Sequence, residues 1–161
     1  MNNLQKEKYL QILFILSISI LLVAYAIQYI LGYQPCNLCI IERIPYALAI
    51  IILILSYIFR KDHVFYTILL LLNFSFSFLI SIYHLGIEQG FFDQSSVCIS
   101  KNIDLMIKED ILKSLQELSI SCKDVAFKIF GLSLTSYNMI ASLIMLLITT
   151  KIYLINNDLK K

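Results

Sequence analysis

The chain has 161 residues, of which 59% are hydrophobic and only 15% are charged. A soluble domain of this length would carry about 25% charged residues, so the composition excludes an ordinary soluble protein and indicates membrane-spanning segments. The formal net charge is only +2 and no basic patch with interleaved aromatic residues is present, which argues against a nucleic-acid-binding protein.

Four apolar runs have the length of about 20 residues that a membrane helix needs. The predicted spans are 10–31, 40–59, 64–85 and 134–154. The second span reaches this length if its helix begins near Cys39 or Ile40, with Pro45 in the first turn or at a kink. Few glycines and prolines are available for linkers, so we expect a single domain over residues 1–161. The sequence therefore predicts an all-α integral membrane protein, a four-transmembrane-helix bundle in the lipid bilayer.

The first span has an alternative interpretation as a cleaved signal peptide. Lys6 and Lys8 precede an apolar stretch, and Ala24-Tyr25-Ala26 imitates a small-residue cleavage site. The apolar run continues as far as Leu31, which favours a retained helix.

The loop after the first span, about 32–44, contains two cysteines in a C-x-x-C arrangement, Cys36 and Cys39. If the second helix begins near Cys39, the sulfur of that residue meets the positive end of the helix dipole. Arg43 lies four residues further on and adds a permanent cation on the same helix face, so both effects favour the thiolate form of Cys39. Glu42 opposes them, but at i+3 it is expected to point somewhat away.

His84 and Glu88 follow the third span at a spacing of i, i+4 and can face the same site as Arg43. An ionisable residue at this depth is a functional candidate, although a histidine satisfied by interfacial water is the alternative. Asn138 lies in the fourth span, where an amide is expected to pack helices together or to cap.

The second long loop, about 86–133, contains Cys98 and Cys122 and is far longer than a mere connection. Such a loop can dock a protein partner. Apolar residues recur between the two cysteines at spacings of three and four, which predicts a short amphipathic surface helix on the membrane or on the top of the bundle. These apolar residues are Ile103, Met106, Ile107, Ile111, Leu115 and Leu118.

Two further interpretations of the four cysteines stay open. C-x-x-C is also half of a zinc site, with Cys98 and Cys122 as the second half, and two static structural disulfides are equally compatible with the pattern. In either case the chain would be a structural or metal-binding membrane protein, and Arg43 would serve as an anchor at the membrane interface.

Basic residues in the flanks of the spans predict the orientation. With the N-terminus inside, one side of the membrane receives Lys6, Lys8, Arg60, Lys61, Lys151, Lys160 and Lys161. The short loop on the other side has only Arg43, and the long loop there has more acidic than basic residues. The basic side is therefore expected to be cytoplasmic, which places both termini inside and all four cysteines on the oxidising side, where disulfides persist.

The cysteine motifs resemble those of the DsbB family, the bacterial inner-membrane oxidases that re-oxidise the periplasmic thiol oxidase DsbA using quinone. The resemblance covers nearly the whole chain, and its most specific part is the string from Pro35 to Arg43, Pro-Cys-Asn-Leu-Cys-Ile-Ile-Glu-Arg. The other matching positions are His84, Cys98, Cys122 and Phe130-Gly131-Leu132. One departure is Ser95-Ser96-Val97 before Cys98, where the family pattern has a proline.

The resemblance implies a relay of disulfide exchanges in the periplasmic loops. Cys98 and Cys122 would form the disulfide that the reduced DsbA-like partner attacks, with Cys98 carrying the mixed disulfide. Cys122 would then attack Cys36, and Cys39 would leave as a thiolate that passes electrons to ubiquinone or menaquinone. The implied quinone-binding residues are Arg43, which stabilises the thiolate and the quinone anion, and His84. No metal is implied.

Overall fold

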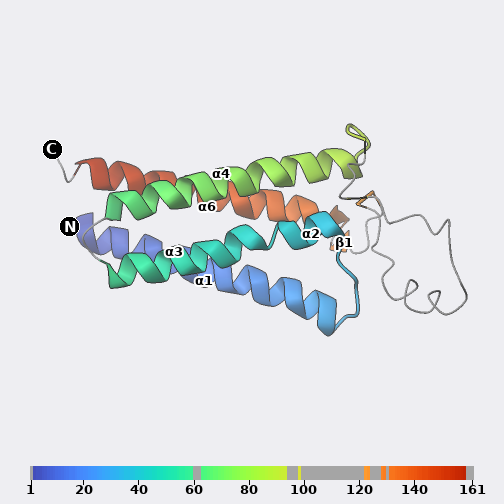
Figure 1. The fold of residues 1–161 in the computed structure, drawn as a ribbon, viewed down its shortest axis with the longest axis horizontal. Helices are drawn as coiled ribbons and strands as arrows, with labels where there is room; N and C mark the ends of the chain where they lie inside the picture. Colours follow the sequence, from blue (N-terminus) through green and yellow to red (C-terminus); the bar gives the residue numbers. More distant parts are fainter. Residues whose placement is uncertain are drawn as a thin grey trace, which may run out of the picture.

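The computed structural model describes residues 2–59, 63–93, 98, 122–123, 128–129 and 131–158. Its elements are α1 (Asn2–Tyr29), α2 (Asn37–Ile41), α3 (Ile44–Ile58), α4 (His63–Glu88), β1 (Lys128–Ile129), β2 (Leu132–Ser133) and α6 (Leu134–Asp158). The long helices run up and down along one axis, and α1 begins at the same end of the bundle where α6 ends (Figure 1). The short helix α2 and the two-stranded sheet lie at the opposite end.

Four helical segments are long and apolar enough to cross a membrane, namely Leu4–Tyr29, Asn37–Ile58, Val64–Glu88 and Leu134–Asn156. The predicted four-helix membrane bundle is therefore confirmed. The helix α1 extends to Asn2, before the predicted apolar start, because polar residues can continue a helix beyond the hydrocarbon layer. The predicted amphipathic helix over 103–118 lies outside the residues that the structure describes.

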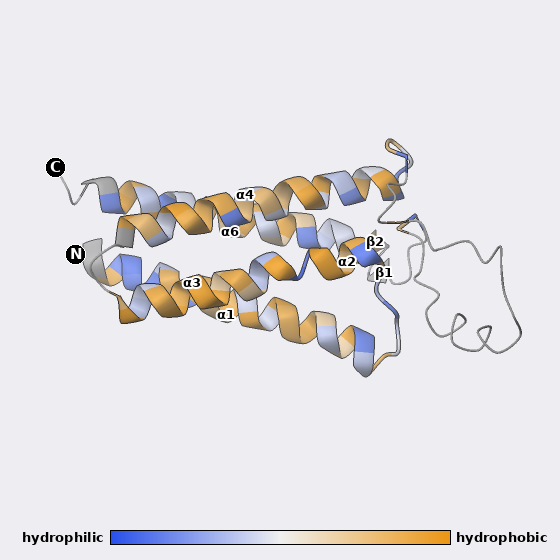
Figure 2. Ribbon diagram, viewed as in Figure 1, coloured by the Kyte–Doolittle hydropathy of each residue, from blue (hydrophilic) through white to orange (hydrophobic). Residues whose placement is uncertain are grey.

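The helices form a closed ring in which α1 packs on α3, α3 on α4, α4 on α6, and α6 again on α1, with the most extensive contact between α4 and α6. Leu13, Tyr46, Phe74 and Met145 contribute one buried side chain from each long helix to the core. The outward faces are also apolar (Figure 2), since Ile15, Leu72 and Leu147 are each more than 60% exposed. Such a surface suits a lipid environment and would be unfavourable in water.

The second span is not one continuous helix, because α2 ends at Ile41 and α3 begins at Ile44. Pro45 lies in the first turn of α3, where its missing N–H costs no helical hydrogen bond. In a continuous helix the Pro45 ring would instead clash with the carbonyl of Ile41, so the break replaces the kink that the sequence offered as the alternative. The structure also begins the span earlier than predicted, at Asn37, with Cys36 as the N-cap residue.

A chain of buried hydrogen bonds joins three of the helices. Tyr46 on α3 donates to Asn138 Oδ1 on α6 at 2.6 Å, and Asn138 Nδ2 donates to Ser81 Oγ on α4 at 2.8 Å. Ser142 Oγ lies 3.0 Å from the Tyr46 hydroxyl and 2.9 Å from Ser77 Oγ. These contacts confirm the predicted helix-packing role of Asn138, and they hold α3, α4 and α6 in one register.

We expect Ser142→Ala to destabilise the bundle by about 1 kcal/mol, because interhelical hydrogen bonds in membranes contribute about 0.6 kcal/mol each and Ser142 contacts two partners. Thermal unfolding in detergent micelles measures the change. Thr150→Ala is the matched control, since the exposed Thr150 hydroxyl donates only within its own helix, to the Leu146 carbonyl. Equal melting temperatures for the two variants would contradict this prediction.

Candidate active site

Both cysteine pairs form disulfides, and the two disulfides belong to one buried cluster. Cys36 and Cys39 are bonded with their Cα atoms 5.1 Å apart, and Cys98 and Cys122 with theirs 5.4 Å apart. All four sulfurs pack in a cluster completed by Leu38 and Ile87, and only Cys39 is more than slightly exposed. The fold thus brings together two disulfides that lie far apart in the sequence.

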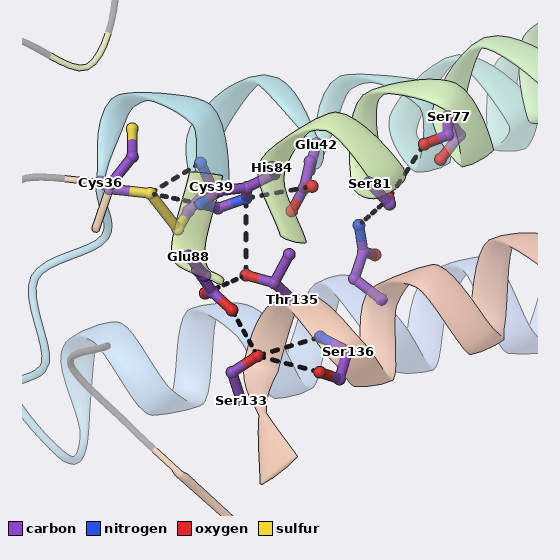
Figure 3. A network of polar contacts seen from close by, with 12 residues as sticks. Cys36, Cys39, Glu42, Ser77, Ser81, His84, Glu88, Ser133, Thr135 and Ser136 are labelled. Atoms are coloured by element: carbon purple, nitrogen blue, oxygen red, sulfur yellow. Dashed lines mark hydrogen bonds and ion pairs between the residues drawn. A yellow bond between two sulfur atoms is a disulfide. The ribbon is translucent and has the colours of Figure 1, made fainter. Parts of the chain in front are cut away.

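His84 lies against the first disulfide (Figure 3). Its Nε2 is 3.5 Å from Cys36 Sγ and its Nδ1 is 3.2 Å from Glu42 Oε1. The histidine is only 1% exposed and Glu42 only 6%, so this carboxylate, imidazole and sulfur meet away from bulk water. The prediction that Glu42 points away is wrong, since its carboxylate contacts His84 on α4 and lines the same cavity as Cys39.

A second carboxylate, that of Glu88, is held by the last residue of β2 and the first turn of α6. Thr135 donates to Glu88 Oε1 and Ser133 to Glu88 Oε2, both at 2.6 Å. The Thr135 hydroxyl also lies 3.5 Å from His84 Nδ1, so the two carboxylates flank one imidazole (Figure 3). Gly131 has a φ of +82° in the turn between β1 and β2, a conformation that favours glycine and directs the chain into α6.

Arg43 is directed toward α1 and not along α2. Its Nη1 donates to Gln28 Oε1 at 2.5 Å, and its guanidinium carbon lies 5.1 Å from the centre of the Tyr25 ring. The sequence predicted that Arg43 shares a helix face with Cys39, whereas the contacts described for its guanidinium are with Gln28 and Tyr25 on α1. Both residues nevertheless line the same cavity.

This cavity has a volume of about 380 Å³ and lies between the disulfide end of the bundle and α1. Its charged and sulfur-bearing lining residues are Cys36, Cys39, Cys122, Glu42, Arg43, His84 and Glu88, and its apolar wall on α1 includes Ile20, Val23, Ala24 and Ile27. Val23 is 55% exposed, so the cavity borders the outer surface of the bundle. An apolar pocket with a few convergent polar groups is the usual form of a small-molecule site.

The model of the family described as disulfide bond formation protein DsbB matches residues 6–152. The chain belongs to the DsbB family. A similar protein is the uncharacterized protein RP370 of Rickettsia prowazekii (strain Madrid E), which is 32% identical over 157 residues, covering 91% of this chain and 88% of that protein. No solved structure matches the chain. Family membership and the four apolar helices identify a multi-pass membrane protein of disulfide bond formation, a disulfide oxidoreductase.

The disulfides argue against the metal-binding alternative for this DsbB-family chain. The ligand atoms of Cys36, Cys39 and His84 all lie within 4.8 Å of one another, which is close enough to hold an ion. The two sulfurs are bonded to each other, however, and a disulfide offers no thiolate to a metal. Cys98 and Cys122 are likewise bonded to each other and do not complete a four-ligand site.

Sequence reasoning missed three groups in this DsbB-family site. Thr135 and Ser133 were not singled out, although polar residues at the start of an apolar span are a usable signal. Gln28 was not singled out either, although a lone amide near the end of an apolar run is a similar signal. No local pattern indicated that Gln28 pairs with Arg43.

Proposed function

We propose that this chain is a quinone-dependent thiol oxidase that re-oxidises a DsbA-like dithiol protein by disulfide exchange. The observation that carries the proposal is the packing of both disulfides in one cluster beside a cavity with an apolar wall. Exchange requires that the sulfurs of the two couples reach one another, and the cluster meets this requirement.

The relay consists of exchanges in which one S–S bond forms as another breaks. A thiolate of the reduced partner attacks Cys98, forming a mixed disulfide and releasing Cys122 as a thiolate. Cys122 then attacks Cys36, and Cys39 leaves as a thiolate. The partner's second thiolate attacks the partner's own sulfur in the mixed disulfide, which releases the oxidised partner and a Cys98 thiolate. Cys98 finally attacks Cys122, which restores the second disulfide and releases Cys36. Cys36, Cys39 and Cys122 all line the cavity, which supports this order of attack.

An electron acceptor of higher potential than thiols is needed to restore the first disulfide. The reduction potential of a strong dithiol oxidant is about −120 mV, whereas that of ordinary thiol–disulfide pools is about −180 mV. Re-oxidising such an oxidant with these pools is therefore unfavourable by about 2.8 kcal/mol, the free energy of two electrons over about 60 mV. A bound quinone accepts two electrons and two protons. Ubiquinone and menaquinone both supply this chemistry.

The residues around the cavity fit such a group. The volume of about 380 Å³ lies in the range of roughly 300–1,000 Å³ that is usual for ligand pockets. The apolar wall on α1 suits a lipophilic ring, and the exposed Val23 places the cavity at the lipid-facing surface. Arg43 and His84 are the residues that would hold the quinone, because a guanidinium at the cavity favours an anionic oxygen and a Cys39 thiolate.

We place the protein in the bacterial inner membrane with both ends of the chain in the cytoplasm and the cysteine loops in the periplasm. The distribution of lysine and arginine supports this orientation. The bundle agrees with it, because α1 begins and α6 ends at the end remote from the disulfides (Figure 1).

The test of this function mixes purified protein, a soluble quinone analogue and a reduced DsbA-like protein, and follows the quinone absorbance. We expect quinone reduction that depends on both the protein and the partner. A rate no higher than that without the protein would refute the function. Static disulfides would also resist mild reductant, whereas exchanging disulfides would become labelled by alkylating reagents.

Arg43→Ala is expected to raise the quinone concentration for half-maximal rate by about tenfold, which corresponds to losing about 1.4 kcal/mol of binding. The maximal rate should fall less, and Arg43→Lys should be intermediate because the charge stays while the planar fork is lost. Lys151→Ala is the matched control, since Lys151 also lies over a tyrosine ring, that of Tyr9, but at the other end of the bundle. An unchanged quinone dependence in Arg43→Ala would contradict the assigned role.

A further inference from the structure

Glu42 and His84 form a buried carboxylate–imidazole pair, and the ring nitrogen that faces away from Glu42 contacts the Cys36 sulfur. Glu42 Oε1 faces Nδ1 at 3.2 Å, and Nε2 on the opposite side of the ring faces Cys36 Sγ at 3.5 Å. A carboxylate with so little exposure requires a close partner, and the imidazole provides one.

The carboxylate determines which nitrogen carries the proton. A hydrogen on Nδ1 donates to Glu42, which leaves Nε2 without a proton and directed at Cys36. The order of groups, carboxylate, imidazole and then nucleophile, is the one that activates serine and cysteine nucleophiles in unrelated folds. In the disulfide the Cys36 sulfur carries no proton. The arrangement can therefore accept a proton from Cys36 only after the Cys36–Cys39 disulfide has been reduced.

We propose that His84, positioned by Glu42, accepts the thiol proton of Cys36 whenever the Cys36–Cys39 disulfide is reduced. This inference rests on the proposed thiol-oxidase function. In this step the S–H bond of Cys36 breaks and an N–H bond forms at Nε2, without any electron transfer. The products are a Cys36 thiolate and an imidazolium whose charge the Glu42 carboxylate balances.

The proton transfer gives Cys36 a function of its own in the relay. Re-forming the first disulfide requires both cysteines as thiolates, and the two electrons then pass to the quinone proposed above. Arg43 can favour the thiolate of Cys39 from the cavity, but its closest contacts are with Gln28 and Tyr25. The pair formed by Glu42 and His84, here called the dyad, contacts Cys36 instead. The thiolates of Cys36 and Cys39 would therefore be stabilised by different cationic groups, the His84 imidazolium and the Arg43 guanidinium.

The other charged and titratable groups near His84 should affect its proton transfer with Cys36 less than Glu42 does. Glu88 reaches Nδ1 only through the Thr135 hydroxyl, and Arg43 lines the cavity from the side of α1. The remaining titratable side chains around the cavity are Tyr33, Tyr46, Tyr137, Cys39 and Cys122. Glu42 is the carboxylate in direct contact with the ring, so its removal should have the largest effect.

The test measures the pH dependence of Cys36 alkylation by iodoacetamide, without quinone or partner. The protein carries Cys39→Ser, Cys98→Ser and Cys122→Ser, so Cys36 is its only cysteine. We expect the midpoint to lie at least about one pH unit below the ordinary value near 8.5, as for other cysteines paired with histidine. Adding Glu42→Gln or His84→Gln should raise this midpoint by about one pH unit, and Glu42→Asp should restore most of the difference.

Two controls separate the dyad from a general field. Glu88→Gln should raise the midpoint by less than half as much as Glu42→Gln, and Glu7→Gln, near the start of α1 at the remote end of the bundle, should leave it unchanged. Equal shifts for Glu42→Gln and Glu88→Gln, or no shift for Glu42→Gln, would overturn the inference. Active quinone reduction together with an unshifted midpoint would refute only the dyad, whereas a shifted midpoint without quinone reduction would refute only the proposed function.

Discussion

Replacing Cys39 with serine is expected to lower quinone reduction to less than about one-thousandth of the wild-type rate, because the covalent route is removed rather than weakened. Serine forms no bond with the Cys36 sulfur, so Cys122 has no disulfide to attack. Electrons that enter at Cys98 then stop at the second couple. Quinone absorbance during turnover with the reduced partner measures the loss.

The same variant supplies its own control. The Cys98–Cys122 disulfide remains in place, so each protein molecule should still oxidise about one equivalent of partner before turnover stops. Such a single equivalent shows that the protein is folded and that its outer couple is active. Undiminished turnover in Cys39→Ser would contradict the assignment of this residue as the electron donor.

Replacing Cys122 with serine is expected to abolish turnover to a similar extent and to leave Cys98 able to trap a partner. Without its bonded neighbour, the Cys98 thiolate can exchange with the disulfide of an oxidised DsbA-like protein. No second thiol within the loop can then resolve the mixed disulfide. The second cysteine of an oxidised partner would reverse this exchange, so the trapping partner lacks that cysteine and carries its remaining cysteine as a mixed disulfide with a small aromatic thiol. Attack by Cys98 releases the small thiol, and the covalent complex should accumulate.

Non-reducing electrophoresis detects this complex, and mass spectrometry of the linked peptides identifies the attached cysteine. The matched variant Cys98→Ser leaves Cys122 as the free thiol and should trap far less partner. A complex joined mainly through Cys122 or Cys36 would contradict the proposed order of attack.

The parts of this fold that follow from local sequence were predictable. Apolar length predicted the four spans, and α6 begins at Leu134 as expected. The i, i+4 spacing of His84 and Glu88 also placed both residues correctly on one site. These features depend on one helix at a time, so the regular rise and turn of an α-helix are enough to predict them.

The parts that depend on contacts between helices were not predictable in the same way. Glu42 contacts His84 on α4 and Arg43 contacts Gln28 on α1, and the spacing of residues within the second span encodes neither contact. The two disulfides pack together although they lie far apart in the sequence, and no periodic pattern in the sequence predicts this contact.

The position of the cavity has a kinetic consequence under the proposed function. The cavity borders the flank of the bundle at Val23, whereas the sulfur cluster lies at the end of the bundle, around the start of α2. A water-soluble protein would thus reach the second disulfide at the end of the bundle, and a lipid-dissolved carrier would reach the first disulfide through the flank. Neither substrate would block the other, and a double-displacement rate law with parallel reciprocal plots would be the natural outcome.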